Sequence, residues 1–173
     1  KEPVRSVGLS SEIFVRHVST VRPGVSRADA DEVSYHLDIL LRYELELALI
    51  SKELMVADLP GVWNERSAQF IGVTPRSDRE GVLQDVHWAL GMFGYFPTYT
   101  IGSLYAAQLA EAYAKKNPFA EEIRTGHFAD VLGWLRQNVH AVGQRTGAED
   151  IVQRATGKGL DPGAFLRHVG IVG

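Results

Sequence analysis

The chain has 173 residues, a formal net charge of −3 and no cysteine. This charge argues against nucleic-acid binding, which needs a basic face, and the lack of cysteine excludes a disulfide framework or a thiolate zinc site. No apolar run approaches the ~20 residues of a membrane span and no signal peptide is visible, so we expect no membrane partner and a cytoplasmic location. The length fits a single domain over residues 1–173.

Helical spacing dominates the first third of the chain. Apolar residues predict a helix over 11–21, which ends before the Pro-Gly pair at 23–24. Asp29, followed three residues later by Glu32, has the spacing of a capping box. We therefore predict a long helix after this pair, over about 33–51.

Three charged residues recur at four-residue spacing within the long helix: Asp38, Arg42 and Glu46. Arg42 and Glu46 lie one turn apart, where opposite charges can pair. We interpret this row as a solvated face, opposite the leucines that would enter the core.

Start and stop signals predict further helices along the rest of the chain. Pro in a first turn, capping-box pairs and terminal Gly mark these boundaries. No window shows a convincing period of two, so we predict an all-α fold, a single multi-helix domain of about seven to nine helices. The later predicted helices are 59–71, a short one capped by Ser77 or Asp78, 97–116, 118–125, 128–142, 146–156 and 162–169.

The stretch 81–105 departs from this regularity. It carries His87 close to Asp85 and a run of aromatic residues, and three glycines and a proline interrupt it between Gly91 and Gly102. Irregular, aromatic backbone with a histidine is where a pocket can form, although the same side chains can simply fill a core. On a helix, residues two apart do not share a face, so we do not expect Asp85 to orient His87.

Arg27 stands just ahead of the long helix. Its guanidinium can bind a carboxylate through two parallel hydrogen bonds. From the residues alone, however, we prefer an ion pair with Asp29, Asp31 or Glu32, which follow it within a few residues.

Local signals for known catalytic chemistry are absent from the sequence. No two of the six histidines stand four residues apart and there is no HExxH, so we expect no metal site in this chain. There is also no GxSxG elbow and no phosphate-binding glycine loop.

Several motifs together resemble the thermostable carboxypeptidase family, whose members are all-helical HExxH zinc carboxypeptidases. GVLQDVHW, residues 81–88, resembles the GxxQDxHW motif of that family, and GYFPTY, residues 94–99, is similar to the segment that follows it. RADADE, residues 27–32, resembles the start of a long helix there. The likeness continues over 35–50, 104–108, 155–157 and 160–162, and thus covers nearly the whole chain.

The resemblance implies a fold like the C-terminal part of such an enzyme, with residues on the substrate side of its site. Arg27 would bind the C-terminal carboxylate of a peptide, and His87 would line the site. Tyr95 or Tyr99 would support the tetrahedral intermediate. The other motif residues would be structural supports: Gln84, Asp85 and Trp88.

The same resemblance limits what the chain can do alone. In the family, the HExxH segment with two zinc histidines and the general base, and a further glutamate ligand, precede the part seen here. We therefore expect zinc to serve the complete family enzyme but not to bind this chain, which would be inactive alone. The chain is either the substrate-side region of a metallocarboxypeptidase or a stand-alone, non-catalytic module for peptide binding, regulation or subunit interaction. Expected partners are peptide C-termini, the missing N-terminal catalytic region, or a second copy in a dimer.

Overall fold

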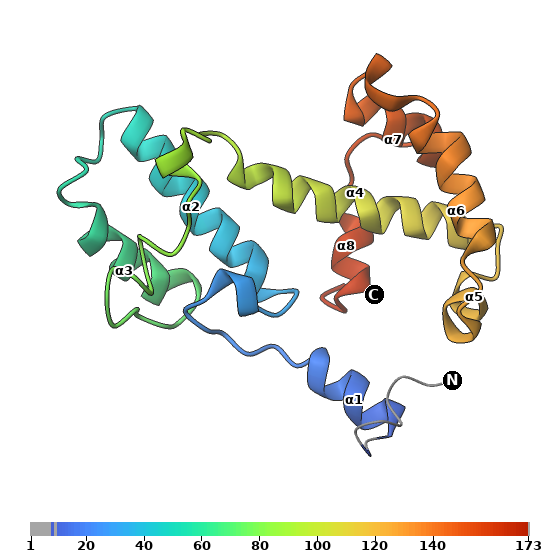
Figure 1. Ribbon diagram of the computed structural model, residues 1–173, viewed down its shortest axis with the longest axis horizontal. Coiled ribbons are helices and arrows are strands. Elements are labelled where there is room, and N and C mark those ends of the chain that lie inside the picture. Colours follow the sequence, from blue (N-terminus) through green and yellow to red (C-terminus); the bar gives the residue numbers. More distant parts are fainter. Residues whose placement is uncertain (1–7, 9, 173) are drawn as a thin grey trace. The chain divides into compact units, whose positions relative to one another are not determined.

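The computed structural model describes Gly8 and residues 10–172, and its regular elements are all helical (Figure 1). The predicted all-α fold is therefore confirmed. None of the described helices is long and apolar enough to cross a membrane. The α-helices are α1 (Ser11–Val18), α2 (Ser34–Ile50), α3 (Leu59–Phe70), α4 (Phe96–Ala114), α5 (Phe119–Thr125), α6 (Ala129–Leu135), α7 (Ala148–Thr156) and α8 (Gly163–His168).

The chain divides into two compact units, one that ends at Tyr99 and one that starts at Thr100. The first contains α2, α3 and the first residues of α4, and the second contains the rest of α4 and the helices that follow. The single domain over residues 1–173 stays a prediction, and each unit is described by itself.

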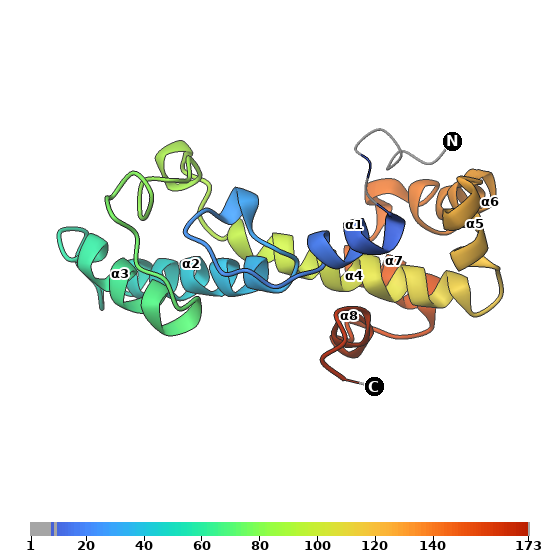
Figure 2. The same ribbon diagram turned by 90° about the horizontal axis from the view of Figure 1, so that it is seen from below.

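The core of the first unit forms where α2 packs on α3, which lie side by side in both ribbon views (Figures 1 and 2). Leu41 and Leu45 of α2 meet Leu59 and Trp63 of α3 in one buried cluster, which Ile71 completes. Burying side chains of this size stabilises a fold by roughly 1.5–3 kcal/mol each. This packing fixes α2, whose polar residues build the candidate site.

In the second unit, the end of α4 is held by Tyr113, which is only 2% exposed. Its ring packs edge-on against Phe119 and Trp134, at centroid distances of 5.5 and 5.6 Å. Its hydroxyl donates to the carboxylate of Glu122, with both oxygens at 2.9 Å. Burial and this hydrogen bond raise the pKa of Tyr113 to about 12.

The short helix predicted from Ser77 or Asp78 is wrong, since residues 77–84 form turns and bends. The side-chain amide of Gln84 donates to the carbonyl oxygens of Glu80, at 2.8 Å, and Val25, at 3.0 Å. A side-chain hydrogen bond from Gln84 thus takes the place of a regular helical one at Glu80.

The later helices follow the predicted order with different ends. The helix expected over 128–142 is α-helical only from Ala129 to Leu135, and a π-helical turn, Arg136–His140, continues it. The capping box predicted at Thr146 does not form, because Gly147 is the N-cap of α7 and no side chain caps it. Gly157 ends α7 in the left-handed conformation, with φ 83°, as its position predicted.

Asp31, rather than Asp29, secures the start of α2. Its Oδ1 accepts the backbone N–H groups of Val33 and Ser34, each at 2.9 Å, and its Oδ2 accepts the Ser34 hydroxyl at 2.7 Å. The backbone N–H of Arg22 also donates to Oδ2, at 2.8 Å. Burial alone would raise the pKa of Asp31, but these hydrogen bonds lower it to about 2.

We expect Asp31→Ala to lower the free energy of unfolding by about 1 kcal/mol at neutral pH, because it removes this cap. The folded pKa of Asp31, about 2, lies below its ordinary value of 3.8. Its ionised form therefore stabilises the fold above that ordinary value, and this contribution is lost as the pH falls from 3.8 toward 2. The difference in free energy of unfolding between wild type and variant should become smaller over the same pH interval.

Urea unfolding at a series of pH values from neutral to acid measures this gap. Asp29→Ala is the matched control, since Asp29 accepts a hydrogen bond from Ser26, outside α2, and it should change the free energy of unfolding little at any pH. An Asp31→Ala gap that stays constant with pH would contradict the role of the ionised carboxylate.

Candidate functional site

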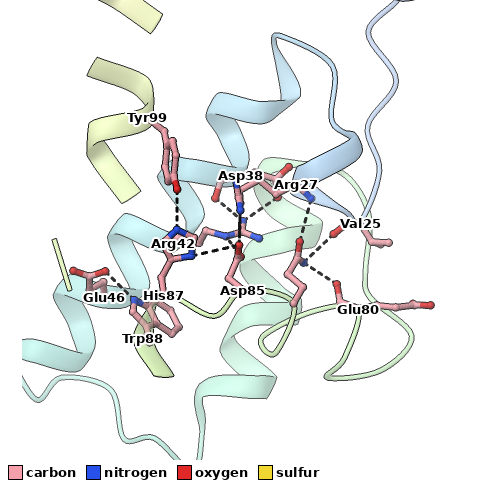
Figure 3. Close-up of polar contacts among 11 residues, drawn as sticks. Val25, Arg27, Asp38, Arg42, Glu46, Glu80, Asp85, His87, Trp88 and Tyr99 are labelled. Atoms are coloured by element: carbon pink, nitrogen blue, oxygen red, sulfur yellow. Dashed lines mark hydrogen bonds and ion pairs between the residues drawn. The ribbon is translucent and has the colours of Figure 1, made fainter. Parts of the chain in front are cut away.

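Asp85 lies at the centre of the candidate site, between two arginines (Figure 3). Its Oδ1 accepts hydrogen bonds from Nε and Nη2 of Arg27, at 3.0 and 2.7 Å. Its Oδ2 accepts a hydrogen bond from Nε of Arg42 at 2.6 Å. Burial alone would raise the pKa of Asp85, but the charge of Arg42 and the hydrogen bonds of both arginines hold it below its ordinary value. A single ionised carboxylate thus joins two guanidinium groups.

The local ion pair preferred for Arg27 is wrong, because its guanidinium reaches Asp85 and none of the acids that follow it. Two of those acids have other partners: Asp29 accepts the hydroxyl of Ser26 at 2.8 Å, and Asp31 caps α2. Arg27 itself lies in a short 3-10 turn, Arg27–Asp29.

Arg27 keeps a partly open position despite this ion pair. Its side chain is 17% exposed, and its guanidinium carbon lies 5.4 Å from the ring centroid of Tyr99 and 5.9 Å from that of Tyr35. Burial alone would lower the pKa of Arg27, but the hydrogen bond and charge of Asp85 raise it. Neither contact to Asp85 uses Nη1, so this nitrogen lies outside the ion pair.

Gln84 holds Arg27 from the backbone side. Its Oε1 accepts the backbone N–H of Arg27 at 3.0 Å, while its amide nitrogen donates to Val25 and Glu80 as described above. These three contacts join Gln84 to the backbone of Val25, Arg27 and Glu80. The supporting role expected for Gln84 stays a prediction.

The charged row on α2 is buried, so its interpretation as a solvated face is wrong. Asp38, Arg42 and Glu46 are 1%, 0% and 6% exposed. Arg42 Nη1 donates to the side chain of Asp38 at 3.0 Å and to its carbonyl oxygen at 2.7 Å. The guanidinium carbon lies 4.8 Å from the ring centroid of Trp63 and 5.6 Å from that of Phe96. Aromatic faces and carboxylates together replace the water that Arg42 loses.

Glu46 holds the aromatic segment that follows Asp85. Its Oε2 accepts the indole N–H of Trp88 at 2.8 Å, and its Oε1 accepts the backbone N–H of Gly94. One carboxylate thus fixes both ends of the segment 88–94 on α2. Trp88 also packs edge-on against Trp63, at 6.4 Å between centroids, and its expected supporting role stays a prediction.

Asp38, Arg42 and Glu46 were missed because the leucines of α2 do not define one face. Leu37 and Leu40 are 37% and 41% exposed, although they share the spacing of the buried leucines. When apolar residues occur on several sides of a helix in the sequence, other parts of the protein are expected to cover the helix on several sides. That signal, together with charges at four-residue spacing, could have indicated a buried polar row.

His87 and Asp85 face one another, contrary to expectation, because residues 85–86 are not helical. His87 Nδ1 lies 3.8 Å from Asp85 Oδ1, and its Nε2 lies 2.9 Å from the Tyr99 hydroxyl. His87 is 8% exposed and packs against Phe96, with ring centroids 4.5 Å apart. The structure therefore aligns Asp85, His87 and Tyr99 (Figure 3).

The two candidate tyrosines differ in their surroundings. Tyr99 bonds His87, and burial followed by the proximity of Tyr95 raises its pKa. Tyr95 is 41% exposed, with its ring 5.7 Å from that of His87 and 5.3 Å from that of Tyr99. All predicted site residues thus lie in the first unit, and their functional roles stay predictions.

No three His, Cys, Asp or Glu side chains of the described residues come together as a metal site would require. Three buried polar atoms around Asp85 also lack a hydrogen-bond partner among these residues: Asp38 Oδ2, Arg42 Nη2 and His87 Nδ1. Burial raises the pKa of Asp38 by more than Arg42 lowers it. The site thus combines two guanidinium groups, the carboxylates of Asp85 and Asp38, and phenol groups.

We expect Glu46→Gln to lower the free energy of unfolding by about 1–3 kcal/mol, because the new NH₂ group leaves a buried N–H of Trp88 or Gly94 without an acceptor. Glu44→Gln is the same change on the same helix, at a side chain that is 40% exposed and 3.9 Å from Arg66. It should alter the free energy of unfolding by less than about 0.5 kcal/mol. Urea unfolding followed by tryptophan fluorescence compares the two variants, and equal losses would refute a buried anchor at Glu46.

Comparison with known proteins places this site in a family. The family model for carboxypeptidase Taq (M32) metallopeptidase matches residues 1–170. Carboxypeptidase 1 of Bacillus subtilis is 43% identical over 160 residues, 92% of this chain and 32% of that protein. Thermostable carboxypeptidase 1 of Thermus thermophilus is 44% identical over 171 residues, 98% of this chain and 34% of that protein.

Solved structures agree with these relatives. The structure of Pyrococcus furiosus carboxypeptidase superposes with a TM-score of 0.89 and 38% identity, and covers 97% of this chain and 34% of that one. For Trypanosoma cruzi metallocarboxypeptidase 1, the TM-score is 0.87 and the identity 35%, with 98% and 35% of the two chains covered. The chain thus spans about a third of the length of the relatives it matches. With a family match over nearly its whole length, this chain belongs to the carboxypeptidase Taq (M32) metallopeptidase family.

Proposed function

We propose that this chain forms the substrate-side region of a metallocarboxypeptidase that removes C-terminal amino acids from peptides. The observation that carries this proposal is the position of Arg27, a partly exposed guanidinium that Asp85 orients beside Tyr99. A guanidinium with one edge on an internal carboxylate can present other N–H groups to a ligand carboxylate. An internal peptide bond offers no such carboxylate, so this contact would select the end of a peptide.

The charges around Asp85 support anion binding. Asp85 bonds both Arg27 and Arg42, and Arg42 also pairs with Asp38 at 3.0 Å. A peptide carboxylate at Arg27 would meet a guanidinium in a partly buried place, where attraction is stronger than in water.

His87 and the tyrosines would act on the reacting carbonyl group. When its imidazole is protonated, Nε2 donates to the oxygen of Tyr99, and the charge of the ring faces Asp85. The hydroxyl of Tyr99 would donate to a developing oxyanion. Tyr95, the more exposed of the pair, is the alternative donor, and either would stabilise the tetrahedral intermediate.

The described residues do not fit a metal centre, since no suitable group of ligands comes together among them. Zinc chemistry in the family enzyme would thus use residues outside the described part of this chain. The residues here would bind the peptide, orient it and donate hydrogen bonds, and none of them would generate the nucleophile. Alone, the chain would be inactive.

The alternative role, a stand-alone module for peptide binding, regulation or subunit interaction, would use the same Arg27 contact without catalysis. An apolar cavity of about 500 Å³ in the first unit favours an interaction of this kind. Its lining includes Met55, Val56 and Phe93, which are 66%, 75% and 51% exposed. The N-terminal catalytic region or a second copy in a dimer would be the partner, and a cytoplasmic location is part of this proposal.

We expect the purified chain to release no C-terminal residues from peptides, with or without added zinc, because it lacks HExxH. Mass spectrometry of the peptide products after long incubation measures release, and an intact metallocarboxypeptidase is the positive control. Zinc-dependent release by a preparation whose mass matches this sequence alone would refute the proposed inactivity.

We also expect the chain to bind a peptide with a free C-terminal carboxylate roughly tenfold or more tightly than its C-terminal amide, since a charge-assisted hydrogen bond contributes about 1.5–3 kcal/mol. Arg27→Gln should abolish this preference. Arg76→Gln, the same change at an exposed arginine, should keep it. Titration calorimetry gives the dissociation constants, and equal affinity of the wild type for both peptides would contradict carboxylate recognition.

A further inference from the structure

The two oxygens of Asp85 are divided between two arginines with different surroundings. Arg27 comes from a short 3-10 turn, is partly exposed and takes Oδ1. Arg42 comes from the middle of α2, is 0% exposed and takes Oδ2 at 2.6 Å. Only one of these two cations can touch a ligand.

The guanidinium of Arg42 is held by polar and aromatic contacts from several helices. Its Nη1 donates twice to Asp38, one turn earlier on the same helix, and its guanidinium lies between the rings of Trp63 and Phe96. These contacts come from α2, α3 and the start of α4, so they fix the guanidinium plane against three helices. A group fixed in this way can orient whatever it binds.

We infer that Arg42 is a positioning residue that acts through Asp85 to set the direction of Arg27 in the proposed carboxylate site. With Oδ2 on Arg42, the carboxylate plane of Asp85 cannot turn, and Oδ1 holds Nε and Nη2 of Arg27 in one orientation. This inference rests on the proposed function, because it concerns how Arg27 meets a peptide carboxylate.

Arg42 also carries a positive charge beside the pair of Arg27 and Asp85. Asp38 lies on the far side of Arg42 at 3.0 Å, so the two arginines face two carboxylates. Lysine keeps this charge but lacks the planar fork that binds Asp85 and Asp38 together. Arg42→Lys therefore separates the orientation of Arg27 from the charge.

The test compares Arg42→Lys with the wild-type chain in two measurements. Calorimetry gives the ratio of dissociation constants for a peptide amide and the same peptide with a free carboxylate. Nuclear magnetic resonance of the ¹⁵Nε–¹Hε group of Arg27, assigned with Arg27→Gln, reports its hydrogen bond to Asp85. We expect Arg42→Lys to lower the ratio at least about fivefold and to shift or broaden the Arg27 signal, because lysine lacks the planar fork that holds Asp85 and Asp38 at once.

Ser67→Ala is the matched control for a general loss of stability. Ser67 is 2% exposed in the same unit, and its hydroxyl donates to the carbonyl of Val73 at 2.7 Å, away from Asp85. This variant should have a lower free energy of unfolding than the wild type. It should keep the wild-type ratio of dissociation constants and the wild-type resonance of the Arg27 Nε–H group. If Ser67→Ala lowers the ratio as much as Arg42→Lys does, Arg42 has only a structural role and the inference fails.

A double-mutant cycle tests the path through Asp85. In an Asp85→Asn background, Arg42→Lys should change the ratio by less than about twofold, because the connection is already broken. Equal effects of Arg42→Lys in both backgrounds would overturn the inference. If Arg42→Lys does not fold, Asp38→Asn replaces it, since it removes the charge that holds the far side of Arg42 and leaves the apolar contacts in place.

The two proposals fail in different ways. A wild-type chain that binds acid and amide peptides equally rejects the proposed function, and the Arg27 signal then decides the inference alone. If Arg42→Lys leaves the Arg27 resonance unchanged, the inference is overturned. If the variant changes this resonance, Arg42 orients Arg27. A wild-type preference that Arg42→Lys leaves intact overturns the inference and keeps the proposed function.

Discussion

The structure of the first unit depends on one carboxylate that two guanidinium groups share. Burying charges is costly unless each finds a partner, and a buried pair that loses one member leaves an uncompensated charge. Asp85 meets this condition for Arg27 and Arg42 at once, with separate oxygens for each. Because these residues come from three separate parts of the chain, the shared carboxylate also fixes how those parts meet. The folding of the unit and the direction of Arg27 therefore follow from the same contacts.

α2 is the rigid element to which the irregular segments attach. Its residues at four-residue spacing reach different partners: Arg42 binds the segment at Asp85, and Glu46 binds Trp88 and Gly94. The backbone over 77–95 contains little regular structure, so it cannot hold its side chains in place by helical hydrogen bonds. Buried polar contacts to a well-packed helix replace that support. The aromatic side chains then take fixed positions, including the alignment of His87 with Tyr99.

Family membership and geometry answer different questions about this chain. The match over residues 1–170 establishes a metallopeptidase family and its helical fold, while the chain spans only about a third of its relatives. A metal ligand set is not found among the described residues, whereas cationic and phenolic groups gather in one place. The gathering of cationic and phenolic groups is the basis for proposing that these residues recognise a substrate.

The sequence by itself determined the helical fold, the order of the helices and the family resemblance. The starts at Pro60 and Pro97 and the end at Gly157 were predictable because proline and glycine restrict or permit backbone angles locally. Only the tertiary structure decided that Asp38, Arg42 and Glu46 are buried, that Arg27 pairs with Asp85, and that Asp85 faces His87. Spacing along a helix tells which residues share a face but not what covers that face. Arg27, Arg42 and Glu46 each have a partner more than forty residues away in sequence, and packing of α2 against α3 and the irregular segment selects these partners.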